Sequence, residues 1–281
     1  MVSVKRFAAE EPALFKATQE FVQIFAHVPD PVLAVAARAK DANAQMAWAL
    51  LGTDLFQDRS CTEMASLLSA LYAEFPDEKL WTLPVPTASK INAVVQRTFG
   101  SNNWSLFEHV AGIFWSVGLF VRHHENLVAW AAERTPAEIW RDLGEIYFMG
   151  KKSVRPKACA AIYRLLMPAP LGLGIAFRTP EKRARGMSVM PPLPLTMGMR
   201  RFLAILGPAR DADFSGLEPE RKQKLAETFC AALCPENPYV AAHALQFFLE
   251  TGKEDFICRE QTKSCTKCPL YEHCGYAVRQ G

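Results

Sequence analysis

The stretch Cys258-Arg-Glu-Gln-Thr-Lys-Ser-Cys265-Thr-Lys-Cys268-Pro-Leu-Tyr-Glu-His-Cys274 holds four of the eight cysteines in the chain. Disulfide frameworks spread their cysteines through a domain, so this crowding favours metal binding over disulfide pairing. The spacing Cys-x6-Cys-x2-Cys-x5-Cys is short enough for one loop to wrap a single cubane with four thiolates. The sequence therefore predicts a [4Fe-4S] cluster bound by these four cysteines.

Tetrahedral zinc is the alternative for this loop. Structural zinc loops usually pair two close knuckles, and only Cys265 and Cys268 are spaced as such a knuckle here. His273 stands beside Cys274 but is not needed as a ligand when four thiolates are present. The other cysteines lie apart in helix-like surroundings, where a cysteine is usually a small buried hydrophobe. They are Cys61, Cys159, Cys230 and Cys234.

The rest of the chain has the hydrophobic periodicity of helices. Apolar residues recur three and four positions apart, as in Leu106, Val110, Ile113, Phe114, Val117, Phe120 and Val121. Thr135-Pro-Ala-Glu138 has the capping box and first-turn proline of a helix start, and Ser105 precedes Glu108 at the same spacing. Asp30-Pro31 is expected to open a helix that continues to Leu51. The predicted fold class is all-α.

The apolar content and the apolar runs bear on the kind of protein. Half of the 281 residues are hydrophobic, enough for a sizeable core in one or two domains. The longest uncharged apolar stretch, Val110 to Val121, falls short of the about 20 residues that cross a bilayer. No signal-peptide pattern follows Met1. We therefore expect a protein without a membrane partner, located in the cytoplasm.

Positive charge gathers in one segment. Residues 151–201 hold eleven basic residues and one acidic residue, a net +10, so the rest of the chain carries −7 of the overall +3. A basic surface on an otherwise acidic protein is typical of a nucleic-acid site, because bound phosphates release counterions. The alternative is a solvated loop that serves solubility. The candidate DNA contacts in this segment are Lys151, Lys152, Arg155, Lys182, Arg183, Arg185, Arg200 and Arg201.

The cysteine spacing, with Tyr276 two places after the last cysteine, resembles the cluster loop of endonuclease III and the related adenine glycosylases. His243, Leu245 and Gly252 ahead of the first cysteine are also similar to that family. The resemblance implies a two-domain helical fold with a structural cluster loop at residues 258–274, in which Lys263 and Lys267 meet DNA phosphates. It suggests a helical bundle over residues 41–150, a hairpin and catalytic segment over 151–207, and a second domain from 1–40 and 208–281.

The family also carries a helix-hairpin-helix of the form Leu-Pro-Gly-Val-Gly-x-Lys-Thr-Ala. The best match is Lys152-Ser-Val-Arg-Pro-Lys157-Ala-Cys159, in which Ser153 and Arg155 replace both hairpin glycines. By this resemblance, Lys157 is the lysine that forms a Schiff base with the sugar once the base is flipped out. The alternative is that Lys157 only contacts phosphate or solvent.

The family's catalytic aspartate has no counterpart in the matching segment, where Thr196 takes its place and Gly198 that of the following histidine. A substitute carboxylate is therefore needed for glycosylase chemistry. Glu145, on the helix before the hairpin, is the candidate that we place in the site. Other candidates, which can equally be ordinary surface charges, are Asp54, Asp58, Asp211 and Asp213.

Two functions of different classes follow from these expectations. The first is a monomeric, nucleoid-associated iron-sulfur protein of base-excision repair that binds double-stranded DNA, as a DNA glycosylase or abasic-site lyase. The second is a non-catalytic nucleic-acid-binding protein that keeps the fold and the cluster but has lost the catalytic aspartate. An iron-sulfur electron carrier is a third possibility, but no other redox or docking motif accompanies the cysteines.

Overall fold

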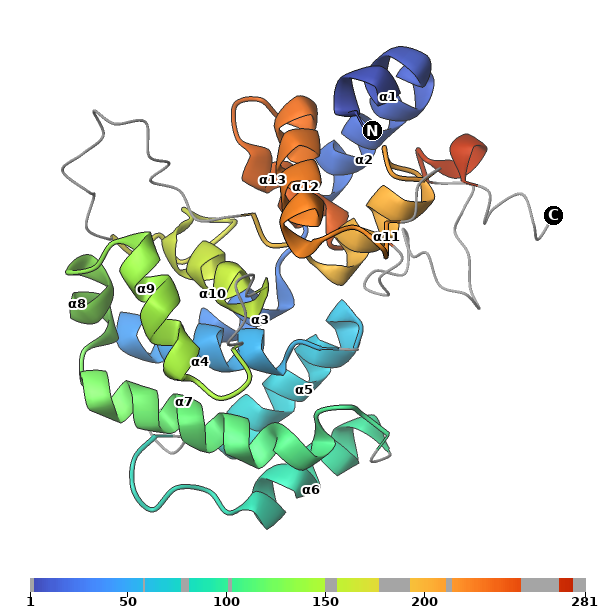
Figure 1. The fold of residues 1–281 in the computed structure, drawn as a ribbon. Coiled ribbons are helices and arrows are strands. Elements are labelled where there is room, and N and C mark those ends of the chain that lie inside the picture. The colour runs from blue at the N-terminus through green and yellow to red at the C-terminus, as the bar shows by residue number, and fades with distance from the viewer. Residues whose placement is uncertain are drawn as a thin grey trace. The chain divides into compact units, whose positions relative to one another are not determined.

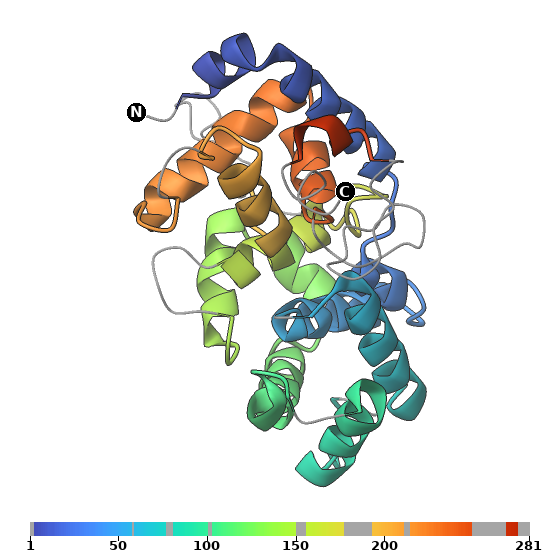
Figure 2. The same cartoon turned by 90° about the vertical axis from the view of Figure 1, so that its right-hand side faces the viewer.

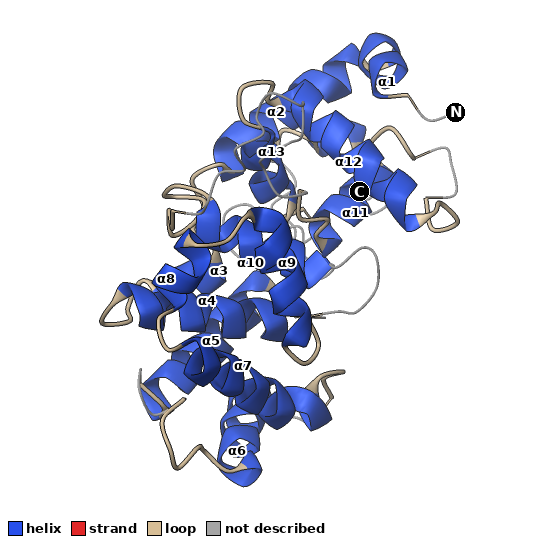
Figure 3. Ribbon diagram, turned by 60° about the vertical axis from the view of Figure 1, so that its left-hand side comes forward, coloured by secondary structure: helices blue, strands red, loops and turns tan. Residues whose placement is uncertain are grey.

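The computed structural model describes residues 3–57, 59–76, 81–100, 103–149, 156–176, 193–210, 214–248 and 268–274. Within these residues the secondary structure is helical and no strand occurs, as Figure 3 shows. The all-α prediction is confirmed for this part of the chain. None of its helices combines the length and the apolar character needed to cross a membrane.

The chain divides into two compact units, which we call unit 1 (Met1–Val28 and Pro192–Gly281) and unit 2 (Pro29–Pro191). These borders differ from the expected ones in two places. Residues 29–40 belong to unit 2 because their helix packs on the two helices that follow it. Residues 192–207 belong to unit 1, where their helix packs on α13 (Pro238–Leu245).

Unit 2 is organised around α4 (Ala42–Leu55), which contacts α3, α7, α8 and α10. Nearly every α4 residue from Ala44 to Leu55 is buried, which fits a helix that is apolar on all sides. Figure 1 shows α10 beside it. The other helices of unit 2 are α3 (Pro31–Ala36), α5 (Cys61–Glu74), α6 (Ala88–Phe99), η2 (Phe107–His109), α7 (Val110–His124), α8 (Leu127–Ala132), α9 (Pro136–Asp142), η3 (Leu143–Glu145) and α10 (Pro156–Leu166).

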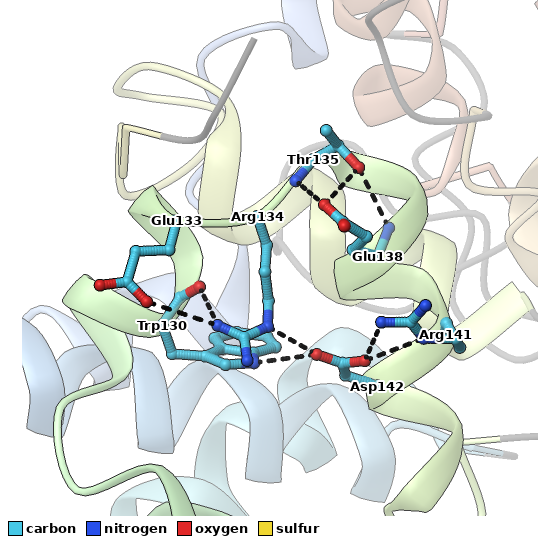
Figure 4. A network of polar contacts seen from close by, with 7 residues as sticks. All are labelled: Trp130, Glu133, Arg134, Thr135, Glu138, Arg141 and Asp142. Carbon is cyan, nitrogen blue, oxygen red and sulfur yellow. Dashed lines mark hydrogen bonds and ion pairs between the residues drawn. The ribbon is translucent and has the colours of Figure 1, made fainter. Parts of the chain in front are cut away.

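Local side-chain chemistry sets several helix starts in unit 2. The predicted capping box at Thr135 is present, with Glu138 accepting from the Thr135 main-chain N–H (Figure 4). The predicted start at Ser105 is wrong, because η2 intervenes, α7 begins at Val110 and the Ser105 hydroxyl accepts from Gln57 instead.

The single helix expected from Asp30 to Leu51 is also wrong. Asp30 does cap a helix, accepting from the N–H groups of Val32 and Leu33, but that helix, α3, ends at Ala36. Asp41 then caps a new helix by accepting from the N–H of Ala44. A second N-cap aspartate inside the apolar pattern therefore divides it into two helices.

Unit 1 has a core rich in phenylalanine. Phe229 meets Phe7 and Phe202 with ring centroids 5.9 and 5.8 Å apart, and Phe202 also meets Phe248. Figure 2 shows the blue α2 beside the orange helices α12 and α13. The helices of this unit are α1 (Val4–Glu10), α2 (Pro12–Phe25), α11 (Met197–Ile205), α12 (Pro219–Leu233), α13 and η6 (Tyr271–His273).

Candidate active site

Lys157 is the second residue of α10, which begins at Pro156. A proline at the first helical position suits a helix start, since its missing N–H would have no partner there. The face formed by Ala158, Ala161 and Ile162 is fully buried, and α10 packs on α4 and α9. The helix thus holds Lys157 at its N-terminal end, beside the end of α4.

The amine of Lys157 lies against Asp54 of α4. Its Nζ is 3.2 Å from Asp54 Oδ1 and also donates to the main-chain oxygen of Asp54. The side chain of Asp54 is fully buried and that of Lys157 is 17% exposed. This contact joins residues 103 positions apart in the sequence and places a carboxylate within reach of the candidate nucleophile.

Burial dominates the electrostatics of Asp54. It raises the pKa of Asp54 to about 7, and the charge and hydrogen bond of Lys157 oppose that rise. Oδ2 of Asp54 is buried and accepts no hydrogen bond from the described residues. A buried charge with one unsatisfied oxygen is costly, so the carboxyl of Asp54 keeps its proton to a higher pH than an exposed aspartate does.

An aromatic side chain covers the amine. The Phe148 ring centroid lies 5.5 Å from Lys157 Nζ, a cation–π distance. Phe148 has φ +71°, in the left-handed region that a bulky residue rarely adopts. Its ring packs on His109 and Tyr147, and the Tyr147 hydroxyl lies 3.3 Å from His109 Nδ1. Strained backbone of this kind often occurs at functional sites.

Two turns along α10, a buried ion pair fixes the helix. Arg164 is 4% exposed and Asp30 1% exposed, and their closest N–O distance is 2.8 Å. Arg164 also donates to the hydroxyl of Thr53, the residue before Asp54. The register of α10 against α3 and α4, and with it the position of Lys157, is therefore held by directional contacts.

The other predicted catalytic residues lie elsewhere. Glu145 is exposed at the end of η3. Burial lowers the pKa of His124, and the charge of Glu145 opposes that lowering. Thr196 is in unit 1, where it caps α11 by accepting from the Met199 N–H. Of the predicted DNA contacts on α11, Arg201 is exposed, and the pKa of the half-buried Arg200 is lowered by desolvation.

Two of the four cysteines predicted to bind a cluster lie in the described part of the chain. Cys274 is buried and Cys268 half-buried, and they bracket the single turn of η6, whose preceding residue Leu270 is 1% exposed. The Tyr271 N–H donates to the Cys268 carbonyl, and the Cys274 N–H to that of Tyr271. The two cysteines therefore lie at the two ends of one tight, partly buried turn. Among the described residues no group of three metal-binding side chains occurs.

Several predicted residues lie outside the described part of the chain. They are the cluster ligands Cys258 and Cys265, the basic residues Lys151, Lys152, Arg155, Lys182, Arg183, Arg185, Lys263 and Lys267, and the carboxylates Asp58, Asp211 and Asp213.

Comparisons with protein-family models, with curated proteins and with solved structures found no match to the chain. Sequence reasoning named Asp54 only as one of several substitute carboxylates and missed Phe148 altogether. The signal for Asp54 was its place in an otherwise apolar helix, because an aspartate is almost never fully buried without a partner. Phe148 gives no such signal, since its φ is visible only in the fold.

Proposed function

We propose that this chain is a DNA-binding protein of the endonuclease III type in which Lys157 forms a Schiff base with the aldehyde of an abasic deoxyribose. The observation that carries the proposal is the buried contact between Lys157 and Asp54. An amine must lose its proton before it can attack a carbonyl, and a carboxylate at 3.2 Å can receive that proton. A lysine that served only to contact phosphate would gain nothing from such burial.

The proposed reaction consists of Schiff-base formation followed by elimination of the 3′ phosphate. The Lys157 ammonium passes a proton to Asp54, and the free amine attacks C1′ of the ring-opened sugar, forming a C–N bond while the carbonyl oxygen takes up the amine proton. Protonation of that hydroxyl by Asp54 releases water and leaves an iminium. Loss of a proton from C2′ then expels the 3′ phosphate, so the strand is nicked.

The cluster and the two-domain fold of this class are part of the proposal. Cys258, Cys265, Cys268 and Cys274 would hold a [4Fe-4S] cluster, which supplies folding energy to the loop around them. Lys263 and Lys267, inside the same loop, would meet DNA phosphates. The division of the chain into two helical units supports this reading, because the N-terminal and C-terminal segments form one unit and the sequence between them forms the other.

Double-stranded DNA is the proposed partner, and its binding rests on the +10 segment of residues 151–201. Neutralising Lys182, Arg183 and Arg185 by glutamine should weaken binding for every DNA sequence and flatten the salt dependence. A matched triple change at Arg6, Arg97 and Arg141, which are exposed elsewhere on the surface, should have a smaller effect. Equal loss in both triple variants would show that the segment is not the DNA site.

A non-catalytic nucleic-acid-binding protein is the second candidate, and one observation favours it. Thr196 stands where the family has its aspartate, and its hydroxyl is used in capping α11. A threonine cannot stabilise the positive charge that develops when a base is released. If the protein is catalytic, the same threonine limits the proposed activity to nicking of existing abasic sites, without excision of common oxidised bases.

The test is strand nicking of a duplex with one abasic site. Wild-type protein should nick the strand, and Lys157→Ala should lose at least about tenfold in rate because it lacks the amine. Lys16→Ala removes an exposed lysine of unit 1 and serves as the control that should keep full activity. Wild-type protein that binds the duplex without nicking it would support the non-catalytic candidate.

A further inference from the structure

Asp54 and Lys157 are close enough to exchange a proton directly. The amine of Lys157 donates to Asp54 twice, once to the side chain and once to the main-chain oxygen. The second carboxylate oxygen, Oδ2, is buried beside them and accepts nothing from the described residues. The carboxyl group can therefore carry a proton on Oδ2 while Oδ1 still accepts from the amine.

Few other charges act on Asp54. Arg164 and Asp30, on the neighbouring α10 and at the start of α3, are paired with each other. Helix α8 contains no titratable residue, and those of α7 are Arg122, His123 and His124 in its last turn. The Arg122 guanidinium donates to the Trp81 carbonyl. Against the effect of burial, which raises the pKa of Asp54, the charge and hydrogen bond of Lys157 lower it.

We propose that Asp54 is the internal proton acceptor of Lys157, a positioning residue that switches the amine between a protonated resting form and a reactive form. This proposal rests on the proposed function of Lys157 and adds its regulation by pH. With a proton on both groups the pair is unreactive. When the pair has lost one proton, transfer from the ammonium to Asp54 yields a free amine inside the protein, although the overall charge of the pair is unchanged.

The switch should operate near neutral pH. Because burial places the pKa of Asp54 at about 7, the pair loses its first proton there instead of near pH 4. Moving the pKa of the carboxyl toward that of the amine also makes internal transfer less unfavourable than it is for an exposed pair. Reactivity of Lys157 toward carbonyl compounds is therefore expected to rise through about pH 7 and then level off.

A small aldehyde tests this without DNA. The full-length protein is treated with glycolaldehyde and cyanoborohydride from about pH 5 to about pH 9, and alkylation at each lysine is read by peptide mass spectrometry. Lys16, whose side chain is 79% exposed, serves as the internal reference. In wild-type protein the ratio of Lys157 to Lys16 alkylation should be flat below about pH 7 and about tenfold lower at pH 8, because exposed Lys16 keeps gaining free amine while Lys157 levels off. Asp54→Asn has no internal acceptor, so its ratio should lack that fall.

As a control, Glu133→Gln removes a carboxylate of unit 2 that is 76% exposed, and this variant should reproduce the wild-type alkylation profile. The same profile in Asp54→Asn would overturn the proposal. If Asp54→Asn does not fold, carbon-13 spectra of aspartate-labelled wild-type protein decide: one carboxyl should titrate near pH 7, and titration of every carboxyl near pH 4 would overturn the proposal. If wild-type protein gives the expected alkylation profile but does not react with abasic DNA, the proposed function is contradicted and the proposal for Asp54 stands.

Discussion

The guanidinium of Arg164 binds the carboxylate of Asp30 through both Nε and Nη2, at 2.8 to 3.1 Å, and both side chains are almost fully buried. Asp30 also caps α3, so the pair ties the start of α3 to α10. Arg164→Leu leaves this carboxylate buried without its partner and should cost about 3–5 kcal/mol in the free energy of unfolding. Urea denaturation measures the loss.

The exposed pair of Arg97 and Glu74, 3.3 Å apart, is the matched control for that change. Arg97→Leu should cost at most about 1 kcal/mol, because exposed ion pairs contribute little. Similar losses in the two variants would mean that the Arg164 pair does not have the buried geometry described.

Asp54 makes the stability of the wild-type protein depend on pH. The folded protein keeps the Asp54 proton up to about pH 7, whereas the unfolded chain releases it near pH 4. The folded state thus binds more protons in this window, and the free energy of unfolding should fall as pH rises from about 4 to about 7. At 1.36 kcal/mol per pKa unit the loss is up to roughly 4 kcal/mol.

Asp54→Asn cannot bind this proton, so its unfolding free energy should lack that decline. Thermal or urea unfolding of both proteins across the window measures the difference. Parallel curves for the two proteins would show that Asp54 titrates at its ordinary pKa.

Gly198 should not tolerate any side chain. A Cβ at this position would lie 2.2 Å from the main-chain oxygen of Gln246 and 2.6 Å from that of Leu245. Because both contacts are with backbone, Gly198→Ala must displace α11 from the end of α13 and should cost about 1–3 kcal/mol or more. Met197→Ala, at an exposed position of the same helix, should stay within about 0.5 kcal/mol of wild type in urea unfolding.

The cysteine loop predicts iron. Purified protein should be brown and contain about four iron atoms per chain, because four closely spaced thiolates favour a cubane. Cys268→Ser should lower both iron content and solubility, whereas Cys61→Ser, at a buried position in α5 of unit 2, should keep the iron. Elemental analysis that finds one zinc and no iron would rule the cluster out.

The sequence predicts the helices better than their borders. Thr135 and Glu138 lie within one turn, so their capping box can be read from spacing alone and is present. The break between α3 and α4 was missed because the apolar pattern continues past Asp41, whose side chain caps a helix that the pattern does not signal. Local rules fail where two signals compete over a few residues.

The partner of Lys157 in the candidate site could be identified only from the fold. Lys157 was found through its similarity to a family motif, but its partner Asp54 is 103 residues away, and no local pattern links the two. Glu145 was preferred because it is close in sequence to the hairpin, yet it is exposed. Packing of α10 on α4 decides which carboxylate faces the lysine, and such contacts between distant segments cannot be read from periodicity.

Borohydride trapping on an abasic duplex decides whether Lys157 is the nucleophile. Reduction should fix a covalent complex between wild-type protein and DNA, peptide mass spectrometry should place the adduct on Lys157, and Lys157→Ala should form none, because only a free amine makes the imine. Wild-type protein that binds the duplex but yields no adduct, or an adduct that survives in Lys157→Ala, would contradict this role of Lys157.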